Sequence, residues 1–325
     1  MIPAVIPVAS VEALARALPR TPLAVLPAPL VAAPRLAEAL GTGPLLVKRD
    51  DLTGFAFGGN KARLLEFLVA AATTDGADTL LTGGAAGSNF CAAAAARRAG
   101  LGCELVIAGR AASPGPALAL ARSWGAAVRW TGVLERDSVD AALPAVAREL
   151  TAAGRRPYLI PRGGATGLGA VGYALAAAEL HAQLDELGRR DVTVLVPTGS
   201  GGTLAGLVAG HMLLGRPWAL LGGSASRPPR VAARQVLSLA RDCLRRARRW
   251  HRSWHRSWHR TGPGRRHRRR RPRPRSRRAL GGRPGRRRAG DEDGGTDARP
   301  GVHGQGAGPG PDEPARGLLA HRRRA

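Results

Sequence analysis

Lysine and cysteine are scarce in this chain of 325 residues. Only two lysines occur among 50 basic residues, and the three cysteines (Cys91, Cys103 and Cys243) form neither a CxxC pair nor a metal-ligand spacing. We therefore expect no disulfide scaffold, no metal site and a reducing, cytoplasmic setting. No uniformly apolar stretch of about 18 residues is present. A membrane span is therefore not expected. The N-terminus has no basic segment, so a secretory signal is not expected either.

Positive charge is concentrated in the last quarter of the chain. Residues 245–325 hold 26 arginines and 6 acidic residues, which account for +20 of the net charge of +27. The first 244 residues carry only +7 and have the composition of a globular protein. The basic average of the whole chain is therefore no evidence that the globular part binds nucleic acid.

The segment 245–325 is of low complexity, with a Trp-His-Arg-Ser repeat, arginine runs and a Gly/Pro-rich end. It cannot bury enough apolar surface to offset its conformational entropy, so we expect it to be disordered. Three interpretations stay open. It is an inert tail, or an arm whose arginines neutralise phosphates while tryptophans stack on RNA or DNA bases. The chain is rich in alanine, glycine, arginine and proline, all of which have GC-rich codons, and this favours the third, a shift of reading frame near residue 245.

Residues 1–244 alternate short apolar runs, glycine loops and alanine-rich stretches. The alanine-rich stretches predict helices at Asn60–Ala72, at Asn89–Ala99 and near Ala117–Trp124. This order is typical of a parallel α/β sheet with flanking helices. The predicted strands are Leu45–Lys48, Thr79–Leu81, Glu104–Ala108, Ala127–Trp130, Tyr158–Ile160, Val192–Val196 and Ala219–Gly222.

Lys61 follows a glycine pair and Asn60 at the predicted start of a helix. The partial positive charge of a helix N-terminus disfavours the ammonium form, and a neutral lysine amine can form a Schiff base. Because arginine is so strongly preferred elsewhere, a retained lysine suggests a need for an amine that can lose its proton. The alternative is a surface lysine in the first helical turn.

A phosphate-sized anion site is predicted at Gly199-Ser200-Gly201-Gly202-Thr203, between a strand and a helix. Small residues let main-chain N–H groups approach an anion, and the helix N-terminus favours phosphate. The alternative is a plain glycine-rich turn. Ser88 and Asn89 occupy a similar position after another strand, where they fit either a carboxylate site or a helix N-cap.

The run Gly167–Gly172 matches GxGxxG, the glycine pattern of dinucleotide-binding loops. A dinucleotide site needs a strand directly before the first glycine, and Tyr158–Ile160 ends too early for that. We therefore interpret these glycines as sites of close helix packing.

Together these motifs resemble the pyridoxal-phosphate enzymes of the 1-aminocyclopropane-1-carboxylate deaminase / D-cysteine desulfhydrase family. The resemblance runs from about Pro19 to about Leu244, three quarters of the chain. It rests on Val47–Gly54 with Gly58–Lys61, Thr82–Asn89, Tyr158–Gly164, Gly199–Thr203 and Ser224–Pro228, which follow in the family's order.

The resemblance implies the two-domain type II fold of pyridoxal-phosphate enzymes, similar to the tryptophan synthase β subunit. Residues 1–49 and 166–244 would form an incomplete large domain, and 50–165 a small domain. The resemblance also suggests a homodimer.

The implied cofactor is pyridoxal 5′-phosphate. Lys61 would hold it and then act as base or acid at the α-carbon of the substrate. Asn89 and Asn60 would contact the cofactor ring, and Gly199–Thr203 would bind the phosphate. Ser88, with Asn89, would meet the substrate carboxylate. The cofactor supplies the electron sink and the protein supplies orientation.

The implied substrate is a small amino acid. D-cysteine, which would yield pyruvate, ammonia and sulfide, is the leading expectation. The alternatives are 1-aminocyclopropane-1-carboxylate and L-cysteate. A hypothesis of another class is a decayed, inactive enzyme whose basic tail binds nucleic acid.

Two departures from the family pattern bear on activity. Phe90 stands where the family commonly has histidine, and the family's Tyr-Thr-Gly-Lys-Ala and His-Thr-Gly-Gly segments are absent. Read one base forward, the codons of residues 302–306 and 320–323 can encode both segments, which favours a frame shift. If the written frame is the true product, we expect little or no activity, because those ring and substrate contacts are missing.

Overall fold

The computed structural model describes residues 11, 18–56, 59–87, 90–111 and 115–261. All seven predicted strands are present, with ends shifted by up to three residues. In chain order the elements are β1 (Leu30–Ala32), α2 (Pro34–Leu40), β2 (Leu46–Lys48), the 3₁₀ turn η1 (Asp50–Leu52), α3 (Lys61–Thr74), β3 (Thr79–Gly84), α4 (Phe90–Arg98), β4 (Gly102–Ile107), α5 (Pro116–Ser123), β5 (Ala126–Trp130), α6 (Asp137–Ala152), β6 (Pro157–Leu159), the 3₁₀ turn η2 (Arg162–Gly164), α7 (Gly167–Glu186), β7 (Thr193–Thr198), α8 (Gly202–Leu213), β8 (Ala219–Ser224) and α9 (Pro229–Thr261).

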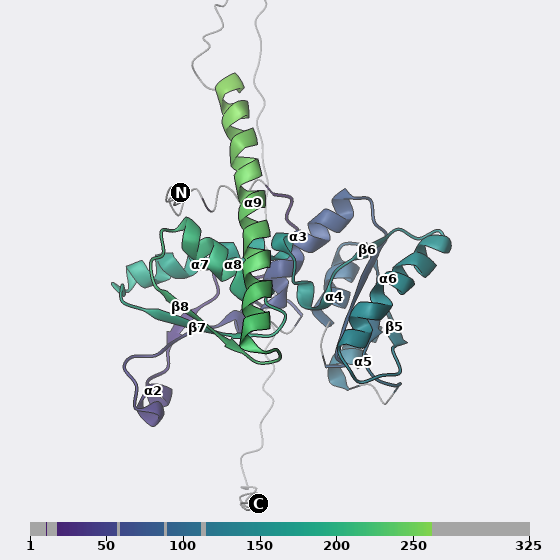
Figure 1. The fold of residues 1–325 in the computed structure, drawn as a ribbon, viewed down its shortest axis with the longest axis horizontal. Coiled ribbons are helices and arrows are strands. Elements are labelled where there is room, and N and C mark those ends of the chain that lie inside the picture. Colours follow the sequence, from purple (N-terminus) through teal and green to yellow (C-terminus); the bar gives the residue numbers. More distant parts are fainter. Residues whose placement is uncertain (1–10, 12–17, 57–58, 88–89, 112–114, 262–325) are drawn as a thin grey trace, which may run out of the picture. The chain divides into compact units, whose positions relative to one another are not determined.

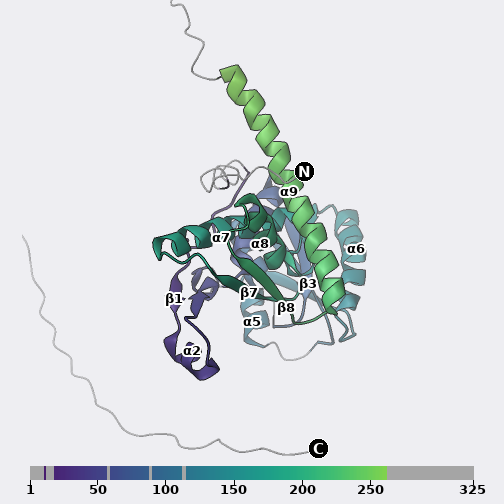
Figure 2. The ribbon, with the colours of Figure 1, turned by 60° about the vertical axis from the view of Figure 1, so that its left-hand side comes forward.

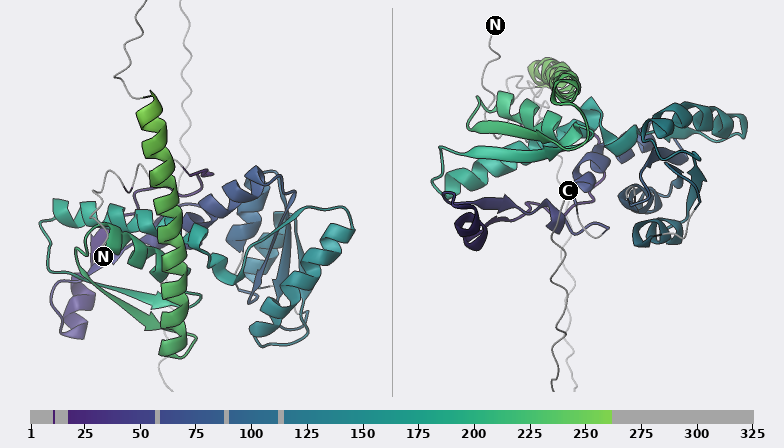
Figure 3. Two further views of the ribbon diagram at one scale, coloured as in Figure 1. Left: turned by 45° about the horizontal axis from the view of Figure 1, so that its top comes forward. Right: turned by 60° about the horizontal axis from the view of Figure 1, so that its bottom comes forward.

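Four strands form a parallel sheet in the order β5-β4-β3-β6 (Figure 1). Neighbouring residues of a strand point to opposite faces, so Leu80 and Leu81 of β3 belong to different apolar clusters. Leu81 packs with Val139 and Leu143 of α6, whereas Leu80 joins the cluster that contains Leu118 of α5. Helices therefore cover both faces of this sheet, as a parallel sheet requires (Figure 3).

A second group of elements contains the parallel pair β7–β8 and the helices α7, α8 and α9 (Figure 2). Glycines let α8 approach α7 closely. A Cβ at Gly206 would lie 2.2 Å from the carbonyl oxygen of Ala170, and one at Gly210 would lie 2.5 Å from the Ala177 Cβ. Because α3 also packs on α7, helix α7 contacts both helices whose N-terminal ends begin near the site, α3 and α8.

Gly172 confirms the packing interpretation of the GxGxxG run. A Cβ at this position would lie 2.1 Å from the Arg63 carbonyl oxygen of α3, and one at Gly169 would lie 2.6 Å from the Gly164 carbonyl oxygen. These contacts are main-chain atoms, which cannot rotate away. The glycines therefore set the distance between α7 and its neighbours.

We expect Gly172→Ala to lower the free energy of unfolding by about 1–3 kcal/mol, because α7 must move away from α3. Gly43→Ala is the matched control, since a Cβ there meets nothing within 4 Å. Chemical denaturation of both variants measures the difference. Equal stability of the two variants would contradict the packing argument.

The C-terminal helix corrects one expectation. Disorder was expected from residue 245, but α9 continues to Thr261 and includes the Trp-His-Arg-Ser repeats (Figures 1 and 2). The physical reason is that no glycine or proline occurs between Val231 and Thr261, while arginine and alanine favour helix. Gly262 and Pro263 then follow. Residues 262–325 lie outside the described residues.

Across the ranges that the structure describes, no helix is both long enough and apolar enough to cross a bilayer.

Candidate active site

One large cavity, of about 900 Å³, lies where several chain segments meet. The ends of β3, β7 and β8 reach it, in keeping with the rule that parallel strands present ligand sites at their carboxyl ends. Its walls include Asn60 and Lys61 before and at the start of α3, Thr82–Gly84 of β3, Gly163 and Gly164 of η2, Gly199 and Ser200 after β7, and Ser226 and Arg227 after β8.

Lys61 is the first residue of α3 and a half-buried part of the cavity wall. The sequence prediction of a lysine at a helix start, after a glycine turn, is therefore confirmed in position. Gly59 has φ +103°, a left-handed conformation that suits glycine. From this turn the chain enters α3, and Lys61 contributes to the wall of the cavity.

The predicted phosphate loop is divided between the cavity and the protein interior. Gly199 and Ser200 line the cavity, while Gly201 (φ +91°) turns the chain into α8. Gly202 packs inward, where a Cβ would lie 3.0 Å from Leu64 Cδ2. The Thr203 hydroxyl accepts a hydrogen bond of 2.9 Å from Asn60 Nδ2, so the structure couples Asn60 to the loop.

Arg227 is a cavity residue to which the sequence analysis gave no role. Its Nη1 donates to the Gly199 carbonyl oxygen at 2.7 Å, which sets a positive charge beside the glycine loop. The Ser224 hydroxyl donates to the Arg227 carbonyl oxygen, also at 2.7 Å, and closes the turn after β8. The signal available in the sequence was the motif Ser224–Pro228, which was noted only as a family resemblance.

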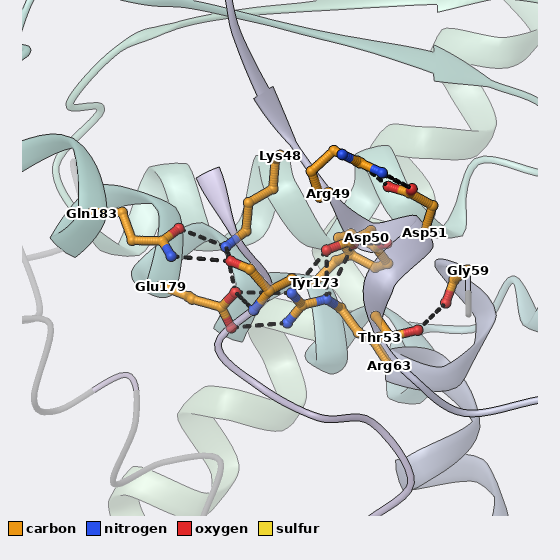
Figure 4. Close-up of polar contacts among 11 residues, drawn as sticks. Lys48, Arg49, Asp50, Asp51, Thr53, Gly59, Arg63, Tyr173, Glu179 and Gln183 are labelled. Carbon is orange, nitrogen blue, oxygen red and sulfur yellow. Dashed lines mark hydrogen bonds and ion pairs between the residues drawn. The ribbon is translucent and has the colours of Figure 1, made fainter. Parts of the chain in front are cut away.

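An ion-pair network is centred on Arg63, in the first turn of α3 (Figure 4). Arg63, whose side chain is 1% exposed, donates to the Asp50 carboxylate at 2.9–3.2 Å and to Glu179 at 2.9 and 3.0 Å. The Tyr173 hydroxyl donates to Asp50 at 2.5 Å. Lys48 Nζ contacts Glu179 at 2.5 Å and the Ala28 carbonyl oxygen at 2.6 Å.

Burial and ion pairing act in opposite directions on these groups. Burial alone would raise the pKa of Glu179, but hydrogen bonds from Arg63 and Lys48 outweigh it and the pKa is lowered. For Lys48 burial dominates and lowers the pKa, although Glu179 opposes the shift. Burial raises the pKa of Tyr173, and Asp50 raises it further, so this phenol stays protonated.

The two lysines of the chain therefore have different surroundings. Lys48 is held by a carboxylate, an amide and a main-chain carbonyl, and it is not among the residues that line the cavity. Lys48 is therefore part of the ion-pair network, where it has a structural role. Lys61 alone of the two lines the cavity.

Ser88 and Asn89, the predicted carboxylate site, lie outside the described residues. Their neighbours Gly87 and Ala92 line the cavity. Phe90 is the first residue of α4, and its side chain also lies outside the description. Within the described part of the chain, no group of three His, Cys, Asp or Glu residues could hold a metal ion.

Several known proteins are similar to this chain over most of its length. The family described as "Pyridoxal-phosphate dependent enzyme" matches residues 21–251. A Pyrococcus abyssi protein, described as a candidate 1-aminocyclopropane-1-carboxylate deaminase, is 39% identical over 70% of this chain and 69% of its own. A D-cysteine desulfhydrase of Salmonella paratyphi B is 39% identical over 68% of this chain and 69% of its own.

The solved structures include a crystal structure of an ACC deaminase homologue that matches with a TM-score of 0.68. It is 32% identical, and the match covers 73% of this chain and 72% of that one. This agreement confirms the type II α/β fold. The chain thus belongs to the family of pyridoxal-phosphate dependent enzymes, as a homologue of 1-aminocyclopropane-1-carboxylate deaminases and D-cysteine desulfhydrases.

Proposed function

We propose that the cavity binds pyridoxal 5′-phosphate through Lys61 and that the protein is a lyase or deaminase of a small amino acid, D-cysteine first. The observation that carries this proposal is that Lys61 and the loop residues Gly199 and Ser200 line the same cavity. An imine-forming amine and an anion site on one wall are what a phosphorylated aldehyde needs.

The described residues fit the cofactor. Gly199, Ser200 and the N-terminus of α8 would hold the phosphate, with the Arg227 guanidinium as a nearby positive charge. Gly201 and Gly202 shape the loop from behind, and Thr203 fixes Asn60. Asn60 would face the ring.

When bound, pyridoxal phosphate supplies an electron sink for negative charge at the substrate α-carbon. The Lys61 amine is the cavity group that would accept or return the α-proton. Leu64, Leu65 and Ile160 give the cavity an apolar wall, which excludes water from the reacting atoms. Ser88 and Asn89 stay predictions for the substrate carboxylate.

D-cysteine is proposed as the substrate because a relative of that activity shares 39% identity with the chain. The P. abyssi relative supports 1-aminocyclopropane-1-carboxylate equally in identity, and L-cysteate is a third candidate. Incubation of the full chain, loaded with cofactor, with each compound and with L-cysteine tests the choice. Pyruvate and sulfide from D-cysteine at the highest kcat/KM are expected. Preferred turnover of another compound would overturn the D-cysteine assignment.

Arg227→Ala is expected to weaken the binding of pyridoxal 5′-phosphate by about tenfold, because one charge-assisted contact near the phosphate is lost. Binding of pyridoxal, which lacks the phosphate, should not change. Absorbance titration with both compounds measures the difference. Equal losses for both would show that Arg227 acts only by holding the loop.

We propose a homodimer, a cytoplasmic location and a division into domains 1–49 with 166–244 and 50–165. We also propose that residues after about 245 arise from a shifted reading frame. Sequencing of the gene across codons 230–325 tests that idea. Salt-dependent RNA binding that is lost on deletion of 245–325 would favour the nucleic-acid arm instead.

A further inference from the structure

The turn η1 and α7 hold the main chain immediately before Lys61. The Gly59 amide donates to the Asp50 carbonyl oxygen at 3.0 Å, and the Thr53 hydroxyl donates to the Gly59 carbonyl oxygen at 3.1 Å (Figure 4). Both polar groups of Gly59 are thus fixed by η1 and its C-cap. Thr53 is fully buried, so water does not compete for its hydroxyl.

The side chain of Asp50 extends the same support. Its carboxylate accepts hydrogen bonds from the Tyr173 hydroxyl and from Arg63, which is itself held by Glu179. Asp50 therefore holds Gly59 through its main-chain carbonyl oxygen and binds Tyr173 of α7 through its carboxylate. The charge of Asp50 is compensated, so the clamp holds without an unpaired buried carboxylate.

Tyr173 links this clamp to the other wall of the site. It packs against α8, since a Cβ at Gly206 would lie 2.4 Å from the Tyr173 Cβ. Thr203, in the first turn of α8, accepts a hydrogen bond from Asn60. Asn60 is the residue directly before Lys61. Hydrogen bonds and close packing therefore connect Asp50, through Tyr173 and the start of α8, to Asn60.

We propose that Asp50 and Tyr173 are positioning residues that fix Asn60 and Lys61 relative to the loop at the start of α8. That this geometry serves to hold a phosphorylated aldehyde rests on the proposed function, whereas the fixed geometry of residues 59–61 rests on the hydrogen bonds alone. Neither residue is among those that line the cavity, so each acts through Gly59 or through α8 and Asn60.

Tyr173→Phe is the principal variant, because it removes one hydroxyl and keeps the ring. The chain has only one other tyrosine, Tyr158 in β6, and Tyr158→Phe is the matched control. Thr53→Val, which removes the bond to Gly59, is the second variant in case Tyr173→Phe folds poorly.

The first readout needs no cofactor. Hydrogen exchange followed by mass spectrometry on the full chain should show faster exchange in peptides covering 53–63 for Tyr173→Phe and Thr53→Val. Tyr158→Phe should match the wild type there. Unchanged exchange of 53–63 in both variants would overturn the proposal.

The second readout uses pyridoxal 5′-phosphate. The dissociation constant should rise about tenfold in Tyr173→Phe, and the visible circular dichroism of the bound cofactor should change, since its orientation depends on the wall. Tyr158→Phe should change neither. If the variants exchange faster than the wild type as expected, but the wild type binds no pyridoxal 5′-phosphate, the proposed function is refuted and the positioning role stands. Normal affinity and dichroism in Tyr173→Phe would refute that role.

Discussion

Replacing Lys61 with alanine is expected to abolish the visible absorption band of protein-bound pyridoxal 5′-phosphate, recorded after unbound cofactor has been removed by gel filtration. The band requires a covalent bond between the aldehyde and an amine, and Lys61 is the lysine that lines the cavity. Turnover of any amino acid that the wild type accepts should fall by at least about a hundredfold, because the α-proton also loses its acceptor. Absorbance spectra and product assays measure both effects.

The second lysine provides the matched control. Lys48→Arg keeps the positive charge beside Glu179 and removes an amine, so the band should persist. Lys61→Arg should lose the band as Lys61→Ala does, because arginine cannot form the bond. A band of wild-type intensity in Lys61→Ala, or its loss in a folded Lys48→Arg protein, would place the amine elsewhere.

Replacing Arg63 with methionine is expected to lower the free energy of unfolding by about 3–5 kcal/mol at neutral pH. The substitution leaves the partly buried Asp50 and Glu179 carboxylates, 17% and 14% exposed, against an apolar side chain. Arg129→Met is the control. Arg129 also pairs with two carboxylates, those of Glu104 and Glu149, but its side chain is 40% exposed. Such a pair contributes at most about 1 kcal/mol.

The effect of Arg63→Met should depend on pH. The wild-type pKa of Glu179 is lowered, so the stability that the pair contributes is present above the ordinary glutamate pKa and is lost as pH falls through the folded-state value. In the variant Lys48 still pairs with Glu179, but the loss of Arg63 removes the largest opposition to burial, so we expect that pKa to rise. The stability gap should therefore be widest near neutral pH and narrow in acid. A gap that is constant from neutral to acid pH would contradict this assignment of the network.

The parts of the fold that the sequence predicted are those encoded locally. Seven strands and the helices α3, α4 and α5 were found because a short apolar run, a glycine turn and an alanine-rich stretch follow one another. Helix α6 was not predicted, and it contains Pro144, which normally argues against a helix interior. Helix α9 extends past residue 245 because helix propensity there does not require an apolar core.

The site was predicted in its parts but not in its connections. Lys61 and the loop from Gly199 were singled out by residue type and by position at helix starts. The bond between Asn60 and Thr203 joins residues 143 positions apart, and the pair of Lys48 with Glu179 spans 131. Such pairings depend on how α3, α7 and α8 pack, which no local pattern in the sequence reports.

The most direct test of the account is to map the attachment point of the cofactor. The full chain is mixed with pyridoxal 5′-phosphate, reduced with borohydride to make the bond permanent, digested and analysed by mass spectrometry. The account predicts one pyridoxyl phosphate group, carried by the peptide that contains Lys61. A group on Lys48 or on the N-terminal amine, with none on Lys61, would contradict the assignment of the cavity as the cofactor site.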